Sequence, residues 1–235
     1  MKERPIVFSA EMVRAILEGR KTMTRRVVKS EFLPSSVTEW KFDPARGWVG
    51  IGDVGMCNGA RGEIHLMKCP YGVPGDRLWV KETWCRKWDG LDGFAYNDEG
   101  NLDPSCVLFR ADGYEVEAID GDGLRRWNKD DTAASPWTPA LFMPRWASRI
   151  TLEIVSVRVE RVQDISDADC EAEGVRCNRT LGGWDCDGFA FAKDAFKNLW
   201  DTIYAKNTEY KWDANPWVWV IEFKVADVRL PGVVE

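Results

Sequence analysis

The segment "GRKTMTRR" gathers basic and hydroxyl side chains where a helix is expected to give way to a strand. Lys21 and Thr24 lie three residues apart across this corner. A threonine hydroxyl becomes a useful nucleophile when a base lies within about 3 Å of it. A lysine can be that base if burial and neighbouring cations lower its pKa. The neighbouring cations are Arg20, Arg25 and Arg26, which are also candidates for binding the substrate.

A carboxylate further along the chain could complete such a site. Glu173 stands near the end of an expected helix in "SDADCEAEG", and it could transfer a proton to a leaving amine. These side chains would suffice for amide hydrolysis without a cofactor. From the residues alone a simpler interpretation is favoured: Lys21 and Arg26 hold a phosphate, Thr24 is a strand-forming residue, and Glu173 pairs with a cation.

Further candidates for substrate binding lie in "KETW" and "MPRWASR". Glu82 follows an expected strand, and Arg145 precedes Trp146 directly. An arginine beside a tryptophan can hold a phosphate while the indole stacks on a base. The alternative is a tryptophan packed under its neighbours with the arginine at the rim.

Composition narrows the range of functions. The chain has 235 residues, 45% of them hydrophobic, and a net charge of −6, which argues against sequence-independent binding to nucleic acid. Eight of its basic residues fall within residues 1–30 against three glutamates, so the positive charge is focused. A focused positive site suits a nucleotide or one end of a nucleic acid. The sequence contains no apolar segment long enough to predict a membrane span or a signal peptide. We therefore expect a cytoplasmic protein.

The seven cysteines do not indicate a disulfide framework, because the number is odd and no CxxC pair occurs. One loose metal pattern, Cys57, His65 and Cys69, has spacings unlike those of standard zinc motifs and lacks a fourth ligand. We therefore expect no metal site. The acidic stretches lack the closing glutamate of a calcium loop.

Residue periodicity predicts a mixed α+β fold. Helices are expected between Ser9 and Gly19, between Ser166 and Gly174, and from Phe189 to Ile203. Strands are expected at 5–9, 21–28, 77–84, in a long stretch ending at 162, and at 215–225. Two stretches, 31–68 and 86–142, are rich in turn residues and are interpreted as loop-rich insertions. This order favours one domain, a small mixed barrel flanked by helices, over alternating βαβ units.

Four segments resemble consecutive blocks of the ASCH domain, a family with a PUA-like β-barrel. They are "ILEGRKTMTRR", "PGDRLWV", "TLEIVSVRVERVQDISDADCEAEGV" and "WVWVIEFKV". The first contains the family pattern G-x-K-x-x-[T/E]-x-R as Gly19, Lys21, Thr24 and Arg26. The resemblance covers residues 5–30, 69–85 and 144–225, and it leaves out both insertions.

The resemblance implies a nucleoside or nucleic acid as ligand. One kind of ASCH protein is a bacterial N4-acetylcytidine amidohydrolase, whose lysine, threonine and glutamate correspond to Lys21, Thr24 and Glu173. The resemblance therefore implies that this protein removes an N4-acyl group from a modified cytidine, with Arg26 orienting the substrate. Other members are proposed to bind or cleave RNA, so a non-catalytic module for RNA or modified DNA stays open. The single histidine makes a nuclease the weaker alternative.

Overall fold

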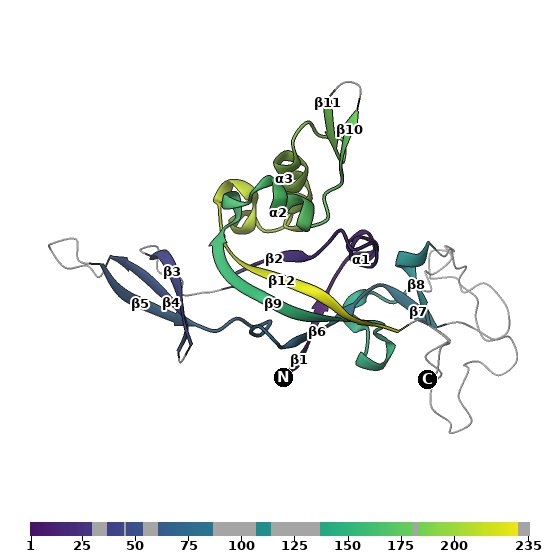
Figure 1. The fold of residues 1–235 in the computed structure, drawn as a ribbon, viewed down its shortest axis with the longest axis horizontal. Coiled ribbons are helices and arrows are strands. Elements are labelled where there is room, and N and C mark those ends of the chain that lie inside the picture. The colour runs from purple at the N-terminus through teal and green to yellow at the C-terminus, as the bar shows by residue number, and fades with distance from the viewer. Residues whose placement is uncertain are drawn as a thin grey trace, which may run out of the picture. The chain divides into compact units, whose positions relative to one another are not determined.

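The computed structural model describes residues 1–29, 37–44, 46–53, 61–86, 107–113, 137–180 and 183–229. Within these ranges the fold is mixed α+β, with more strand than helix (Figure 1). The helices are α1 Ala10–Leu17, α2 Asp167–Ala172 and α3 Ala192–Ile203. The strands are β1 Glu3–Val7, β2 Met23–Val27, β3 Val37–Asp43, β4 Gly47–Asp53, β5 Arg61–Met67, β6 Arg77–Lys81, β7 Trp84–Arg86, β8 Val107–Phe109, β9 Ile150–Arg161, β10 Cys177–Thr180, β11 Gly183–Cys186 and β12 Trp217–Val228.

The predicted order of the main elements is confirmed as α1, β2, β6, β9, α2, α3 and β12. The helix signals are confirmed as well. Ser9 accepts a hydrogen bond from Met12 N at the start of α1, and Ser166 accepts one from Asp169 N at the start of α2. Helices α1 and α2 are each followed by a glycine with positive φ, Gly19 and Gly174, a conformation that glycine adopts without steric cost.

Five strands form one sheet of order β1-β6-β9-β12-β2, in which β1 and β6 are parallel. The strands that the structure describes form no closed barrel. By contact density the chain divides into two discontinuous compact units. Unit 1 comprises residues 1–18, 77–153 and 225–235, and unit 2 comprises residues 19–76 and 154–224.

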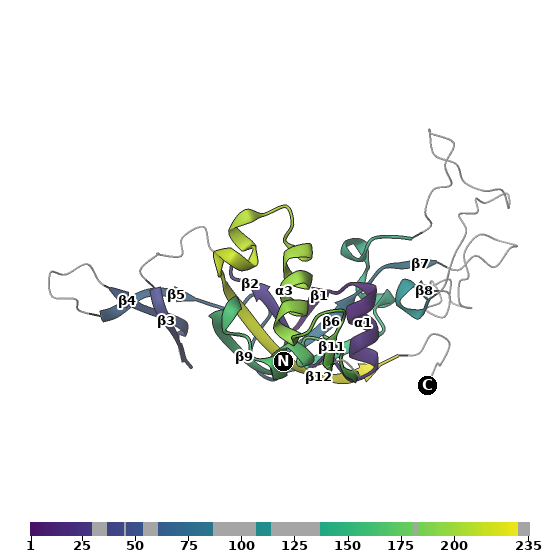
Figure 2. The same ribbon diagram turned by 90° about the horizontal axis from the view of Figure 1, so that it is seen from above.

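The core of unit 2 lies between β2 and β12 on one side and α2 and α3 on the other (Figures 1 and 2). β2 and β12 are antiparallel, with Thr24 opposite Ile221. Met23 and Val27 of β2 pack with Phe196 and Trp200 of α3. The intervening Arg25 is buried on the same face, because successive residues of a strand alternate between the two faces. This face of β2 therefore carries a cation into an apolar core.

The sequence predicted a loop-rich insertion at residues 31–68, and this prediction is wrong for the part that the structure describes. Their described part contains β3, β4 and β5, an antiparallel three-stranded sheet. The glycines of β4 led to the wrong expectation. Gly50 lies opposite Trp40, and a Cβ built on Gly50 would come 3.1 Å from the Trp40 ring. The glycine thus makes room for an indole, which is a packing requirement of a strand and not a loop signal.

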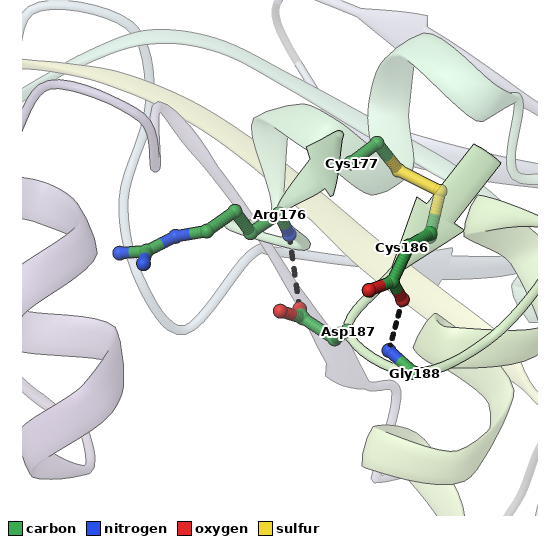
Figure 3. The surroundings of a disulfide bond; sticks show 6 residues. Arg176, Cys177, Cys186, Asp187 and Gly188 are labelled. Atoms are coloured by element: carbon green, nitrogen blue, oxygen red, sulfur yellow. Dashed lines mark hydrogen bonds between the residues drawn. A yellow bond between two sulfur atoms is a disulfide. The ribbon is translucent and has the colours of Figure 1, made fainter. Parts of the chain in front are cut away.

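The cysteine-containing loop after α2 is also more ordered than predicted. β10 and β11 form an antiparallel hairpin in which Cys177 and Cys186 are opposite each other and joined by a disulfide (Figure 3). The hairpin is tied at its base, where Arg176 N donates to Asp187 Oδ2 at 2.9 Å. Cys69, Cys85 and Cys170 are not part of a disulfide bond. Pairing could not be foreseen because cysteine spacing says nothing of strand register.

The second insertion, 86–142, is described only at 86, 107–113 and 137–142. Here β7 and β8 pair, with Trp84 opposite Phe109. Trp84, Phe109 and Met143 belong to one buried cluster of unit 1. In the described ranges, no helix has the length and apolar character needed to cross a membrane.

Candidate active site

The turn before β2 is held by the carboxyl-terminal end of α2. Carbonyl groups at this end of a helix lack partners within the helix and carry partial negative charge. Three successive residues of the turn donate to three successive carbonyls. The contacts are Arg20 Nη1 to Gly174 O at 2.9 Å, Lys21 Nζ to Glu173 O at 2.6 Å, and Thr22 N to Ala172 O at 2.9 Å. The turn is thereby fixed in one place relative to α2.

Lys21 and Glu173 form a buried ion pair. Lys21 Nζ lies 2.6 Å from Glu173 Oε2, and the two residues are only 1% and 5% exposed. The sequence predicted both as catalytic residues, and the structure brings them into direct contact. One ammonium group thus binds both the carboxylate and the main-chain carbonyl of the same residue.

Burial lowers the pKa of Lys21 below its ordinary value. The Glu173 carboxylate raises the pKa in part, and the charges of Arg26 and Arg25 lower it. Removing an ammonium group from water disfavours its charged form, which explains why burial dominates. Lys21 is therefore easier to deprotonate than a lysine in water.

Arg25 connects this pair to further carboxylates. Its Nη2 lies 2.5 Å from Glu160 Oε1 and 2.6 Å from Asp169 Oδ2, and its Nη1 lies 3.5 Å from Glu173 Oε1. The guanidinium has five donors in a rigid plane and can bridge several carboxylates at once. Both oxygens of Glu173 are therefore held, one by Lys21 and the other by Arg25.

Arg158 extends the network along β9. It donates to Glu160 Oε2 at 3.0 Å and to Asp169 Oδ2 at 2.9 Å, and it also pairs with Glu222 of β12. Three cations and four carboxylates thus form one continuous network in unit 2. Such a network fixes the position of Glu173 more firmly than an isolated pair could.

Thr24 lies on the opposite face of β2 from Arg25, which contacts Glu173, and it is 1% exposed. The structure thus brings Lys21 and Glu173 together, but it does not place Thr24 on the same strand face as Arg25. Thr22 and Arg26 share the face of Thr24 by alternation; Thr22 is exposed and Arg26 is half-buried. Arg26 acts electrostatically on Tyr71 and Tyr204, since its charge lowers the pKa of both phenols while burial, the larger effect, raises it. Two tyrosines therefore lie in the neighbourhood of Arg26.

The remaining predicted binding residues belong to unit 1. Glu82 is buried, and both of its oxygens accept hydrogen bonds of 3.0 Å from Arg149. Arg149 also binds Asp112, at 2.7 and 2.8 Å, and covers the Phe109 ring at 4.0 Å. Glu82 is thus part of a second buried ion-pair cluster, with its carboxylate fully engaged.

Arg145 and Trp146 are near the surface of unit 1. Arg145 pairs with Glu3 at 3.1 Å, and its guanidinium lies 5.9 Å from the centre of the Trp79 ring. Trp146 meets Trp84 edge to face at 5.8 Å. Both candidates remain accessible, unlike Glu82.

Sequence reasoning missed the partners that hold the site together. Arg158 and Glu160 alternate with valines in "SVRVERV", which is also the pattern of an ordinary strand with one polar face. Asp169 lies in the first turn of α2, where an acidic residue is common whether or not a cation pairs with it. Of the loose metal pattern, Cys57 lies outside the described residues, and Cys69 is not part of a disulfide bond.

Comparison of the chain with models of protein families, with curated proteins and with solved structures found no match.

Proposed function

We propose that this protein hydrolyses the N4-acyl amide of a modified cytidine. The observation that carries the proposal is the buried contact of 2.6 Å between Lys21 and Glu173, together with the lowered pKa of Lys21. A lysine that deprotonates readily can act as a general base, and a carboxylate in contact with it can pass a proton on. The resemblance to ASCH proteins supplies the substrate class.

The chemistry follows from three side chains. Neutral Lys21 Nζ accepts the proton of Thr24 Oγ1 while that oxygen attacks the acyl carbon, a step for which substrate binding must bring the Thr24 hydroxyl within reach of Lys21. The tetrahedral intermediate collapses, and the cytidine amine leaves with a proton delivered by the Lys21–Glu173 pair. Water then attacks the acyl ester on Thr24, gives up a proton to the same pair, and releases a carboxylic acid. Thr24 and the pair return to their starting states.

The other residues of the site position these groups. Arg25, fixed by Glu160 and Asp169, holds the second oxygen of Glu173. Arg26 is suited to orient the substrate, because it lies on the strand face of Thr24 and is partly exposed. Substrate reaches Thr24 from this face in the proposed arrangement.

Binding of a phosphate chain at these same residues has less support. Lys21 and Arg25 are buried, and each is paired with carboxylates. Two of the cations that would hold phosphates are thus already neutralised inside the protein. The residues described so far favour a small ligand at this site.

The proposal includes the fold family and the cellular location of the protein. The order α1, β2, β6, β9, α2, α3, β12 supports a PUA-like fold of the ASCH type. A cytoplasmic location also belongs to the proposal, and the Cys177–Cys186 disulfide, a bond that is rare in that compartment, counts against it.

Incubation of the purified protein with N4-acetylcytidine, followed by chromatography, tests the proposal. Wild type should release cytidine. The Lys21→Ala variant should release it at least about 100-fold more slowly, which is the usual effect of removing a general base. The proposal fails if wild type releases no cytidine, or if the variant matches it while its circular dichroism spectrum is native.

A further inference from the structure

A disulfide ties the base of the hairpin that follows α2. β10 and β11 form a two-stranded sheet, and Cys177 and Cys186 are its directly opposite residues furthest from the turn (Figure 3). A hairpin of two strands is marginally stable in water unless something else supports it. The disulfide is therefore a main support of this hairpin.

The hairpin is joined to the candidate active site by a short connection. Residues 174–176 alone separate Glu173 from the first cysteine of the bridge. Val175, in the middle of this connection, is buried, and its N–H donates to Cys170 O of α2 at 3.1 Å. The turn that contains Lys21 holds the end of α2 on one side of the connection. The bridged hairpin holds it on the other side.

The bridge is also packed on the core of unit 2. Cys186 is buried within the cluster that contains Phe196 and Trp200, and Cys177 is half-buried against the same cluster. Cleavage of the bond leaves two thiols that this close-packed region must accommodate. Reduction should therefore disturb the packing at the end of α2 as well as the hairpin.

A third cysteine of this cluster does not compete for the bridge. Cys170 of α2 is buried and is not part of a disulfide. Burial raises the pKa of its thiol to about 12, so the thiol stays protonated at neutral pH, and only a thiolate attacks a disulfide. Cleavage must therefore begin with a thiol from outside the cluster. Cys177 is the more exposed of the two bridged residues.

We infer that thiol–disulfide exchange at this bridge switches the candidate active site. A thiolate of an external dithiol attacks the Cys177 sulfur, the S–S bond breaks, and Cys186 leaves as a thiolate and takes up a proton. The second thiolate of the dithiol then displaces Cys177, which is protonated in turn, so the protein gains two thiols and the dithiol becomes a disulfide. The freed hairpin no longer holds the end of α2, and the contact between Lys21 and Glu173 loosens. The effect on hydrolysis rests on the proposed function, whereas the loosening does not.

Hydrogen exchange on the full chain tests the loosening, with wild type oxidised by glutathione disulfide or reduced by dithiothreitol. The amides of residues 173–175 and of Thr22 donate to carbonyls of α2, and they should exchange at least about tenfold faster after reduction. Chain entropy sets the upper limit at about 80-fold for cysteines nine positions apart. The faster exchange should change little at low urea concentrations, because a local opening exposes little surface.

Two variants serve as matched controls for the cysteines. Cys177→Ser/Cys186→Ser should exchange as reduced wild type does, with or without dithiothreitol. Cys69→Ser removes a half-buried cysteine of unit 2 that is not part of a disulfide, and it should respond to reduction as wild type does.

Cytidine release measures the effect of the bridge on the site. Oxidised wild type should release cytidine from N4-acetylcytidine at least about tenfold faster than reduced wild type, because misplacement of a catalytic group by about 1 Å can cost a factor of about 10². Reduction should leave the rate of Cys177→Ser/Cys186→Ser unchanged. If neither form of wild type releases cytidine, the proposed function fails, and hydrogen exchange alone decides the inference.

Three results would overturn the inference. One is equal exchange of these amides in oxidised and reduced wild type. Another is faster exchange that depends steeply on urea, since the whole protein then unfolds. The third is equal cytidine release by the two forms, which would show that the bridge does not control the site. A peptide map prepared without reductant should contain the Cys177–Cys186 bond, and its absence from oxidised wild type would contradict the inference as well.

Discussion

The Lys21 ammonium and the Glu173 carboxylate lie 2.6 Å apart in the protein interior, although 152 residues separate them in the chain. Lys21 also donates to the main-chain carbonyl of Glu173. A buried ion pair contributes little net stability, because desolvation of the charges offsets their attraction. Breaking it by removing one partner is costly, since the other charge is then left unpaired. The coupling energy between Lys21 and Glu173 can therefore be measured.

A double-mutant cycle should show strong coupling between these residues. Lys21→Met and Glu173→Gln should each lower the free energy of unfolding by about 3 kcal/mol, and the double variant should lose much less than the sum. Urea unfolding measures all four proteins. The exposed pair Lys197–Asp213, 3.6 Å apart, is the matched control and should couple by less than about 1 kcal/mol. Additive losses at Lys21 and Glu173 would contradict the structure.

The pH dependence of hydrolysis should report the state of Lys21. Burial lowers the pKa of this lysine, and the base form is the active one. The value of kcat/KM should therefore rise with pH and level off below about 10.4, the ordinary pKa of lysine. Lys21→Arg cannot lose its proton near neutral pH, so it should be inactive throughout. A rate that falls over the same rise in pH would exclude Lys21 as the base.

The free energy of unfolding of the wild-type protein should depend on pH through Glu82. Burial raises the pKa of Glu82, and Arg149 lowers it in part. The folded protein then holds this proton to higher pH than the unfolded chain, whose glutamate titrates near about 4.3. The stability that Glu82 contributes is complete below that value and is lost as pH rises through the folded-state pKa. The stability of wild type relative to Glu82→Gln should thus decrease with pH; an increase would show that the Arg149 charge dominates.

The disulfide of the β10–β11 hairpin should stabilise the fold measurably. It joins residues nine positions apart. Closing a loop of this size lowers the entropy of the unfolded chain, which stabilises the folded state by about 2.5 kcal/mol. Reduction, or the Cys177→Ser/Cys186→Ser variant, should lower Tm by roughly 5 to 10 °C. Cys85→Ser, at a free thiol, should leave the response to reductant intact. Equal melting of oxidised and fully reduced protein would contradict this role.

The sequence predicted elements well where the signal is local. Ser9 and Ser166 begin helices, and Gly19 and Gly174 follow them, because capping depends on a few adjacent residues. The strand expected at 21–28 is confirmed as β2 for the same reason, since alternation of side chains is a local property of the chain.

The partners within the site are contacts between distant segments, and no pattern within one segment could reveal them. Nothing in "VRVER" tells that Glu160 meets Arg25, since either residue could face solvent on a strand. Lys21, Thr24 and Glu173 could be proposed from their residue types alone, and the resemblance to a family added a substrate class. The glycine-rich β4 was missed because its glycines serve a packing contact across the sheet, Gly50 against Trp40.

The central claim is that the Thr24 hydroxyl attacks the acyl carbon with Lys21 as its base, and two matched variants test it most directly. Thr24→Val preserves the shape of this buried side chain and removes the hydroxyl, whereas Thr24→Ser keeps a hydroxyl and removes a methyl group. Cytidine release from N4-acetylcytidine should fall at least about a hundredfold in Thr24→Val and far less in Thr24→Ser. Equal release by wild type and Thr24→Val would contradict the mechanism.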